Sequence, residues 1–117
     1  MAFKFEQLNV WQKALVLTKD THDLTTTFPK EEIYILTSQM KRAADSVALN
    51  IAEGSTGQSN PEFRKFLGYA IRSAIEVVAC LHIGKMRNII SQEDLSTHYE
   101  QLEEIVKMLQ ALRNSIK

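Results

Sequence analysis

The segment from Leu36 to Phe66 constrains the fold of this chain more than any other stretch. It starts as a run of small and apolar residues at helical spacing, passes through the sequence NIAEG into the polar loop STGQSN, and restarts at Asn60, Pro61 and Glu62. A capping side chain followed by proline and a carboxylate is a typical helix start. We therefore predict two helices joined by a short loop, with Gly54 ending the first in left-handed geometry.

The remaining sequence favours further helices and a single domain over residues 1–117. Only two prolines and four glycines interrupt the 117 residues, a length that can bury one continuous core. The chain has no run of about eighteen apolar residues and no apolar signal core at its N-terminus, so we expect a cytoplasmic protein without a membrane span. The single Cys80 lies in an apolar segment, which favours a buried, unreactive thiol.

Apolar residues recur at three- and four-residue steps in four long segments. We predict helices over residues 5–27, 37–53 and 60–87, and a fourth that begins at residue 91. Thr37 and Ser91 are the predicted N-caps of the second and fourth helices, and Phe28-Pro29 ends the first. Four helices with short connections predict an all-α, up-down-up-down antiparallel four-helix bundle.

Two of these helices show a stripe of residues predicted to face the core. The stripe of the first helix is Leu8, Trp11, Leu15, Thr18 and His22. The stripe of the fourth helix, which Arg113 interrupts, is Leu95, Tyr99, Leu102, Val106, Leu109 and Ile116. Alternating steps of four and three residues are typical of helices that pack at a shallow angle.

The third helix is apolar on nearly every side between Ala74 and Gly84, where Glu76 is the one strongly charged residue. Such a helix needs cover on more than one side, and a small bundle has little second layer to offer. We therefore predict self-association, with Val77 and Leu81 as candidate interface residues. A thick monomer core covered by the first helix is the alternative.

Polar residues on the second and third helices are spaced so that they could meet between the helices. Their expected role is to fix helix register and partner orientation. The predicted interhelical network consists of Arg42, Asn50, Glu53, Arg72 and Glu76.

The sequence offers little for catalysis, and we expect no enzyme activity, no metal and no cofactor. The Glu-x-x-His pairs of bundle metal sites are missing, and His22, His82 and His98 have no ligand partner at helical spacing. No serine lies in a nucleophile elbow. The Gly54–Gly57 loop lacks the lysine and preceding strand of a phosphate-binding loop.

Charge gives a second, weaker indication of function. The whole chain is neutral, with 14 basic and 14 acidic residues, which argues against a general nucleic-acid binder. Residues 37–90 nevertheless carry seven Lys or Arg against four Asp or Glu. The basic residues that supply most of this excess are Lys41, Arg42, Arg64, Lys65 and Arg72. They are candidates for RNA or DNA contact, although a solvated helix face is the simpler interpretation.

These residues together carry a resemblance to a known family. The sequence pattern that recurs among the members of that family is present in this chain. Its residues here are Phe5, Leu8, Val10 and Trp11; Phe28 and Pro29; Leu36, Thr37 and Gln39; Arg42, Ala43, Ala44, Ser46 and Val47; Asn50 to Gly54; Glu62, Phe63, Phe66 and Leu67; and Ala70, Ser73 and Glu76. The chain thereby resembles the bacterial four-helix bundle proteins first described from intervening sequences in 23S ribosomal RNA genes.

The resemblance implies an antiparallel bundle that assembles as a homopentameric ring. The family is also similar to the accessory variability protein of diversity-generating retroelements, a basic pentameric barrel, whereas this chain is neutral. Two hypotheses follow. The chain is either a homo-oligomeric scaffold that binds another, unknown protein, or a binder of structured RNA or DNA through the basic residues of its second and third helices.

Overall fold

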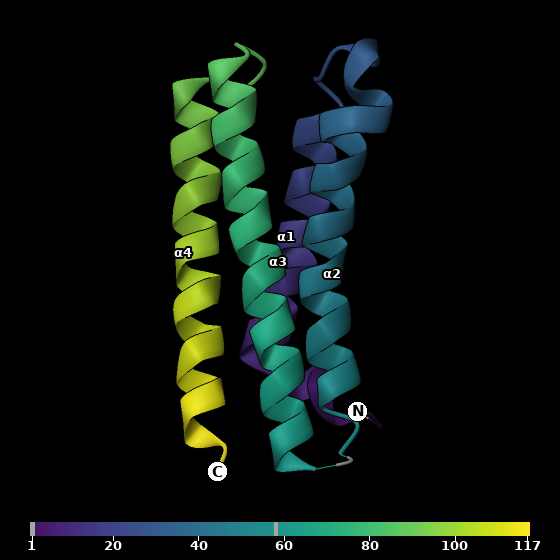
Figure 1. Cartoon of the computed structure of the whole chain (residues 1–117), viewed down its shortest axis with the longest axis vertical. Helices are drawn as coiled ribbons and strands as arrows, with labels where there is room; N and C mark the ends of the chain where they lie inside the picture. Colours follow the sequence, from purple (N-terminus) through teal and green to yellow (C-terminus); the bar gives the residue numbers. More distant parts are fainter. Residues whose placement is uncertain (1, 58) are drawn as a thin grey trace.

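A computed structural model describes residues 2–57 and 59–117 of the chain. Its four long helices are α1 (Asn9–Thr25), α2 (Ser38–Gly54), α3 (Asn60–Met86) and α4 (Gln92–Ser115). Consecutive helices run in opposite directions along a molecule of 43 × 22 × 21 Å, and both termini lie toward the same end (Figure 1). The predicted all-α class and the four-helix bundle are confirmed.

The helices enclose one core. α3 packs against α2 and α4, and α1 packs against the same two helices from the other side. The apolar faces of all four helices therefore meet along a common axis. The largest fully buried side chains include Leu17, Met40, Ile51, Leu67, Leu81, Leu102, Ile105 and Leu109.

α1 buries a different face from the predicted one. Leu15 and His22 are exposed, and a separate 3-10 turn, η1 (Lys4–Gln7), precedes the helix. The buried residues are Val10, Ala14, Leu17, Thr21 and Leu24. The small side chains of Ala14 and Thr21 belong to this buried face, whereas the larger Leu15, one residue after Ala14, lies outside it.

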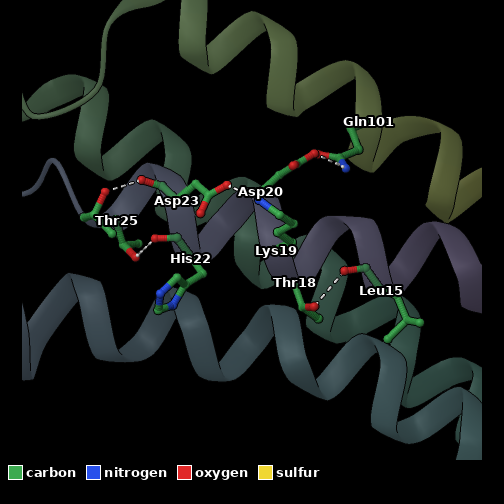
Figure 2. Close-up of polar contacts among 9 residues, drawn as sticks. Leu15, Thr18, Lys19, Asp20, His22, Asp23, Thr25 and Gln101 are labelled. Carbon is green, nitrogen blue, oxygen red and sulfur yellow. Dashed lines mark hydrogen bonds and ion pairs between the residues drawn. The ribbon is translucent and has the colours of Figure 1, made fainter.

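Polar contacts hold the outer side of α1 (Figure 2). Gln101 of α4 donates from Nε2 to Asp20 Oδ2 at 3.1 Å, while Lys19 and Asp23 form a surface ion pair at 2.8 Å. At the helix end, Thr25 Oγ1 donates to the His22 carbonyl at 2.9 Å. The Gln101–Asp20 bond links α1 to α4 outside the core.

The entry to α2 also differs from the prediction. A 3-10 turn, η2 (Lys30–Glu32), and a π-helical turn, η3 (Ile33–Thr37), lead directly into the helix. Thr37 lies at the predicted N-cap position of α2, but it has helical φ −56° and ψ −54° and its side chain makes no capping bond. One turn earlier, Glu32 caps the π-helical turn, because its Oε1 accepts from the Leu36 amide at 3.4 Å.

Gly54 serves close packing rather than left-handed geometry. It lies inside α2, and a Cβ on it would be 2.5 Å from Phe66 Cβ of α3. The left-handed glycine is Gly57, with φ 89°. The cap of α3 is Ser59, whose hydroxyl accepts from the Glu62 amide at 3.2 Å, so the predicted cap at Asn60 is one residue late.

The start of α4 agrees with the prediction, whereas its buried stripe agrees only in part. Ser91 is the N-cap, and its hydroxyl accepts from the Asp94 amide at 3.0 Å. Tyr99 is exposed, and Ile105, which the predicted stripe omitted, is fully buried in its place. The buried residues Leu95, Leu102, Ile105 and Leu109 are spaced by seven, three and four residues, as in a heptad seam that is completed by Ile105 instead of Tyr99 and Val106.

The residues chosen as oligomer contacts lie inside the chain. Val77 is 1% exposed and Leu81 is 0% exposed, so neither reaches the surface. By length and hydropathy α3 could span a membrane, but it is a core helix here, covered by α2 and α4. α3 is thus partly buried, and Val77 and Leu81 belong to the core of one chain, so they are not available as interface residues.

Candidate functional site

The contact between α2 and α3 contains a line of half-buried polar side chains, which we call the α2/α3 seam. Ser73 Oγ donates to Ser46 Oγ at 3.0 Å, and Asn50 Nδ2 reaches the Ser46 hydroxyl at 2.9 Å and the Ser46 carbonyl at 2.8 Å. Spacing of four residues places Ser46 and Asn50 on one side of α2. The seam therefore fixes the register of the two helices.

The seam continues as an open polar groove of about 400 Å³. Its upper part contains Glu76, which accepts from Gln39 Nε2 at 3.3 Å. Tyr69 and Arg72 of α3 complete the lining, together with the serines and Asn50. The groove offers hydroxyl, amide, carboxylate and guanidinium groups within a small space.

The predicted five-residue network forms only in part. Asn50 and Glu76 take part in the seam, with Ser46 and Gln39 as partners that the sequence pattern did not single out. Within residues 2–57 and 59–117, the side chains of Arg42, Glu53 and Arg72 make no hydrogen bond or ion pair. Their long side chains reach solvent, where an ion pair contributes little.

The five basic candidates divide into two groups. Arg64 is committed to structure, since its Nη1 donates to the Arg113 carbonyl and, at 2.9 Å, to the Ile116 carbonyl, capping the end of α4. Lys65 lies 5.7 Å from the centre of the Phe66 ring. Lys41, Arg42 and Arg72 carry head groups that form no ion pair among the described residues, on the adjacent helices α2 and α3.

A second groove lies on the opposite flank of α3, and we call it the α3/α4 groove. It has a volume of about 340 Å³ and is mostly apolar. Its walls are Ile75 and Val78 of α3 and Tyr99, Leu102 and Val106 of α4, with Glu103, Lys107 and Gln110 at its edge. Ile75 is 54% exposed. Apolar surface of this kind is typical of a contact with another molecule.

A further apolar surface lies at the start of α2 and was missed in the sequence. Ile33, Tyr34 and Ile35 follow one another on the π-helical turn, and all three are exposed, with Tyr34 at 92%. We call this run the π-turn knob. The signal in the sequence was three adjacent apolar residues directly after Lys30-Glu31-Glu32, in a segment predicted only as a connector.

The metal-ligand and thiol groups of the described residues offer no distinctive site. Across residues 2–57 and 59–117, no group of three or more His, Cys, Asp or Glu is placed to hold a metal. Burial, with a smaller effect of the nearby Glu76 charge, raises the pKa of the Cys80 thiol, which makes the thiolate less available. The surfaces with distinctive chemistry are thus the α2/α3 seam, the α3/α4 groove and the π-turn knob.

A four-helix bundle with a polar seam and an apolar groove on the two flanks of α3 is the class of protein that these features define. The chain belongs to the 23S rRNA-intervening sequence protein family, whose sequence model matches residues 6–111. The resemblance drawn from the NIAEG segment and its flanking motifs is thereby confirmed.

A solved structure supports the fold. The chain is similar to a protein of unknown function from the S23 ribosomal protein family of Bacteroides thetaiotaomicron VPI-5482, with a TM-score of 0.83 and 24% identity. The similarity covers 90% of this chain and 95% of that one. No curated protein matches this chain.

Proposed function

We propose that the chain is a non-catalytic, cytoplasmic scaffold that assembles into a ring of identical copies and presents the ring surface to a protein partner. The observation that carries this proposal is the α3/α4 groove. Ile75 and Tyr99 leave a continuous apolar surface open to solvent beside the main core helix. Burying such surface against another copy removes it from water at roughly 25 cal/mol per Å².

The ring arrangement and the number of copies in the ring are supported by different observations. A protein that exposes two different apolar surfaces can associate head to tail, and a head-to-tail contact closes into a ring when its rotation permits. The resemblance to pentameric family members supports five copies. Each copy would then contribute the same surfaces around the ring, which suits a scaffold for a larger partner.

The experiment is light scattering after size exclusion on the wild-type chain and two variants. We expect the wild type to have a mass near five times the 13.3 kDa of one chain. Ile75→Asp should shift this mass toward one chain, because a carboxylate in the groove cannot be desolvated without a partner. Val16→Asp is the matched control, since Val16 on α1 is also 54% exposed and lies outside the groove.

Three results would count against this function. A wild-type chain that remains a monomer at high micromolar concentration removes its basis. An assembly that survives Ile75→Asp moves the contact elsewhere. Disruption by Val16→Asp would assign the contact to α1. Circular dichroism of each variant confirms that the helices are retained.

A second candidate function is binding to structured RNA or DNA. The specific observation is the pair Arg42 and Arg72, which project from adjacent helices with no ion pair among the described residues and flank the α2/α3 seam. Phosphate groups bind such guanidinium groups, and binding weakens steeply as salt is raised. A ring would bring several copies of the pair onto one surface.

The test is retention of a mixed RNA and duplex DNA probe at low and at physiological salt. Binding through this pair predicts that Arg42→Gln with Arg72→Gln abolishes retention while the assembly stays intact. Lys107→Gln is the control, since Lys107 is an exposed cation at the other groove. Nucleic-acid binding through this pair is excluded if the double variant retains the probe as well as the wild type does. It is also excluded if the wild type does not retain the probe. Arg64 is left intact because its loss would uncap α4.

A further inference from the structure

We propose that the copies associate head to tail, with the π-turn knob of one copy seated in the α3/α4 groove of the next. This inference rests on the proposed self-association and specifies its contact. The knob is Ile33, Tyr34 and Ile35, and the groove is walled by Ile75 and Tyr99 among others. Because knob and groove are different surfaces, the same contact can repeat from copy to copy.

The knob has the features of an interface anchor. Three consecutive exposed apolar residues are unfavourable in water unless they are used for binding. Tyrosine is among the side chains that contribute most to interfaces, since it provides a large rigid ring and a polar tip. A Tyr34 that is 92% exposed has almost all of its surface left for a partner.

The knob is held in place before any partner arrives. Leu36, directly after it, is buried, and Glu32, directly before it, accepts from the Leu36 amide at 3.4 Å. Glu32 is also paired with Arg87 at the end of α3, at 3.2 Å. Both ends of the knob are therefore fixed to the bundle, which lowers the entropy that docking would cost.

The groove matches the knob in chemistry. Its walls are apolar, and its edge carries one acid and one base, Glu103 and Lys107, both exposed. Before Glu32, which is paired with Arg87, the knob is preceded by one exposed base and one exposed acid, Lys30 and Glu31. Within the described part of the chain none of these four residues forms an ion pair. Opposite charges around an apolar centre resemble the polar rim of a protein interface.

A second copy is the occupant that this pattern favours. Inside one chain the knob cannot fill the groove, because Tyr34 is almost wholly exposed while the groove is open. One copy thus carries one unfilled groove and one unpartnered knob, each of the chemistry that the other requires. A closed ring uses both in every copy, and the closure strengthens contacts that are individually small.

The experiment mixes two variants that each lack one half of the contact. Tyr34→Asp removes the knob and Ile75→Asp removes the groove, and both positions are exposed, so both variants should fold. Each alone should be a monomer in light scattering. Mixed at high micromolar concentration, they should form a dimer of twice the 13.3 kDa chain mass, since one intact knob and one intact groove remain.

The outcomes separate this inference from the proposed function. A wild-type monomer overturns both. A wild-type assembly that Tyr34→Asp leaves intact overturns the head-to-tail contact and keeps the scaffold. Two monomeric variants that stay monomeric when mixed also overturn the head-to-tail contact. If Ile75→Asp loses its helical signal in circular dichroism, Tyr99→Asp replaces it as the groove variant.

A covalent check uses the same pair of positions. One copy carries Tyr34→Cys and the other Ile75→Cys, while the native Cys80 is buried and does not compete. Oxidation should link the mixed variants much faster than either variant with itself. Equal rates in the mixture and in the separate samples would contradict the proposed docking.

Discussion

The two grooves on either side of α3 differ in what one chain does with them. In the α2/α3 seam, Ser46, Asn50 and Ser73 hydrogen-bond one another within the bundle. The α3/α4 groove remains open and apolar around Ile75. The comparison indicates that the seam serves the fold, whereas the groove is surface that the fold leaves available for a partner.

The largest effect on the free energy of unfolding is expected when a carboxylate is placed in the core instead of in the α3/α4 groove. Val77→Asp buries a carboxylate without a partner next to α2 and α4, and we expect the free energy of unfolding to fall by about 4 kcal/mol or more. Ile75→Asp, two residues earlier, should change it by less than about 1 kcal/mol. Thermal and urea unfolding followed by circular dichroism measure both.

The contrast between Val77→Asp and Ile75→Asp would be contradicted if both variants lost the same free energy of unfolding. Equal destabilisation would show that Ile75 belongs to the core of one chain. Val77→Ala provides a milder core change, for which we expect a loss of about 2 kcal/mol.

The next effect concerns how closely α2 and α3 approach. Gly54→Ala places a Cβ within 2.5 Å of Phe66 Cβ, so the helices must separate, and we expect a loss of about 1–3 kcal/mol. Gly68→Ala is the matched control inside α3. Its Cβ would lie 3.7 Å from Arg113 Cζ, an ordinary contact, so the change should be neutral or stabilise the helix by up to about 1 kcal/mol. A tolerated Gly54→Ala would contradict the close approach.

A smaller effect is expected from the hydrogen bonds of the seam. Ser46→Ala removes the oxygen that accepts from both Ser73 and Asn50, and we expect a loss of about 1 kcal/mol in urea unfolding. Ser38→Ala, at an exposed serine of the same helix, should cost less than about 0.5 kcal/mol. Assembly should be unchanged in both variants, because the seam does not face the proposed contact. A loss of assembly on Ser46→Ala would transfer the binding role from the groove to the seam.

The smallest effect lies on α1, away from both grooves. The hydrogen bond from Lys19, with a further electrostatic contribution, lowers the pKa of the Asp23 carboxyl. A lowered folded-state pKa gives stability that is present above the unfolded carboxyl pKa and is lost as pH falls through the folded value. Asp23→Asn should therefore lower the melting temperature slightly at neutral pH and not at strongly acidic pH. An equal effect at both would mean that the pair is irrelevant to stability.

The sequence predicted the elements better than it predicted the faces that they bury. The Ser91 cap follows from local chemistry that requires nothing from the rest of the chain. The restart of α3 was placed within one residue, because Ser59 and Asn60 are both good caps and only the three-dimensional path of the loop selects Ser59.

Which face of a helix is buried depends on the helices that pack against it. α1 has more apolar residues than one face can bury, so spacing alone did not distinguish Leu15, which is exposed, from Leu17, which is buried. Gly54 was assigned a turn geometry because its close contact with Phe66 involves a residue on another helix.

The sequence led to a proposal of self-association through α3, but it did not single out the residues of α3 that are exposed. The excess apolarity of α3 is real, but Val77 and Leu81 are used by the chain's own core and Ile75 is the residue left outside. The π-turn knob was passed over because a π-helical turn has no simple sequence pattern.

Small-angle X-ray scattering on the wild-type chain tests the central claim, that copies of the chain cover each other's exposed apolar surfaces. One chain has a radius of gyration of 14.6 Å and a longest extent of 43 Å. We expect values well above both at micromolar concentration, with a central minimum in density typical of a ring. A radius close to 14.6 Å that does not change with concentration would contradict it.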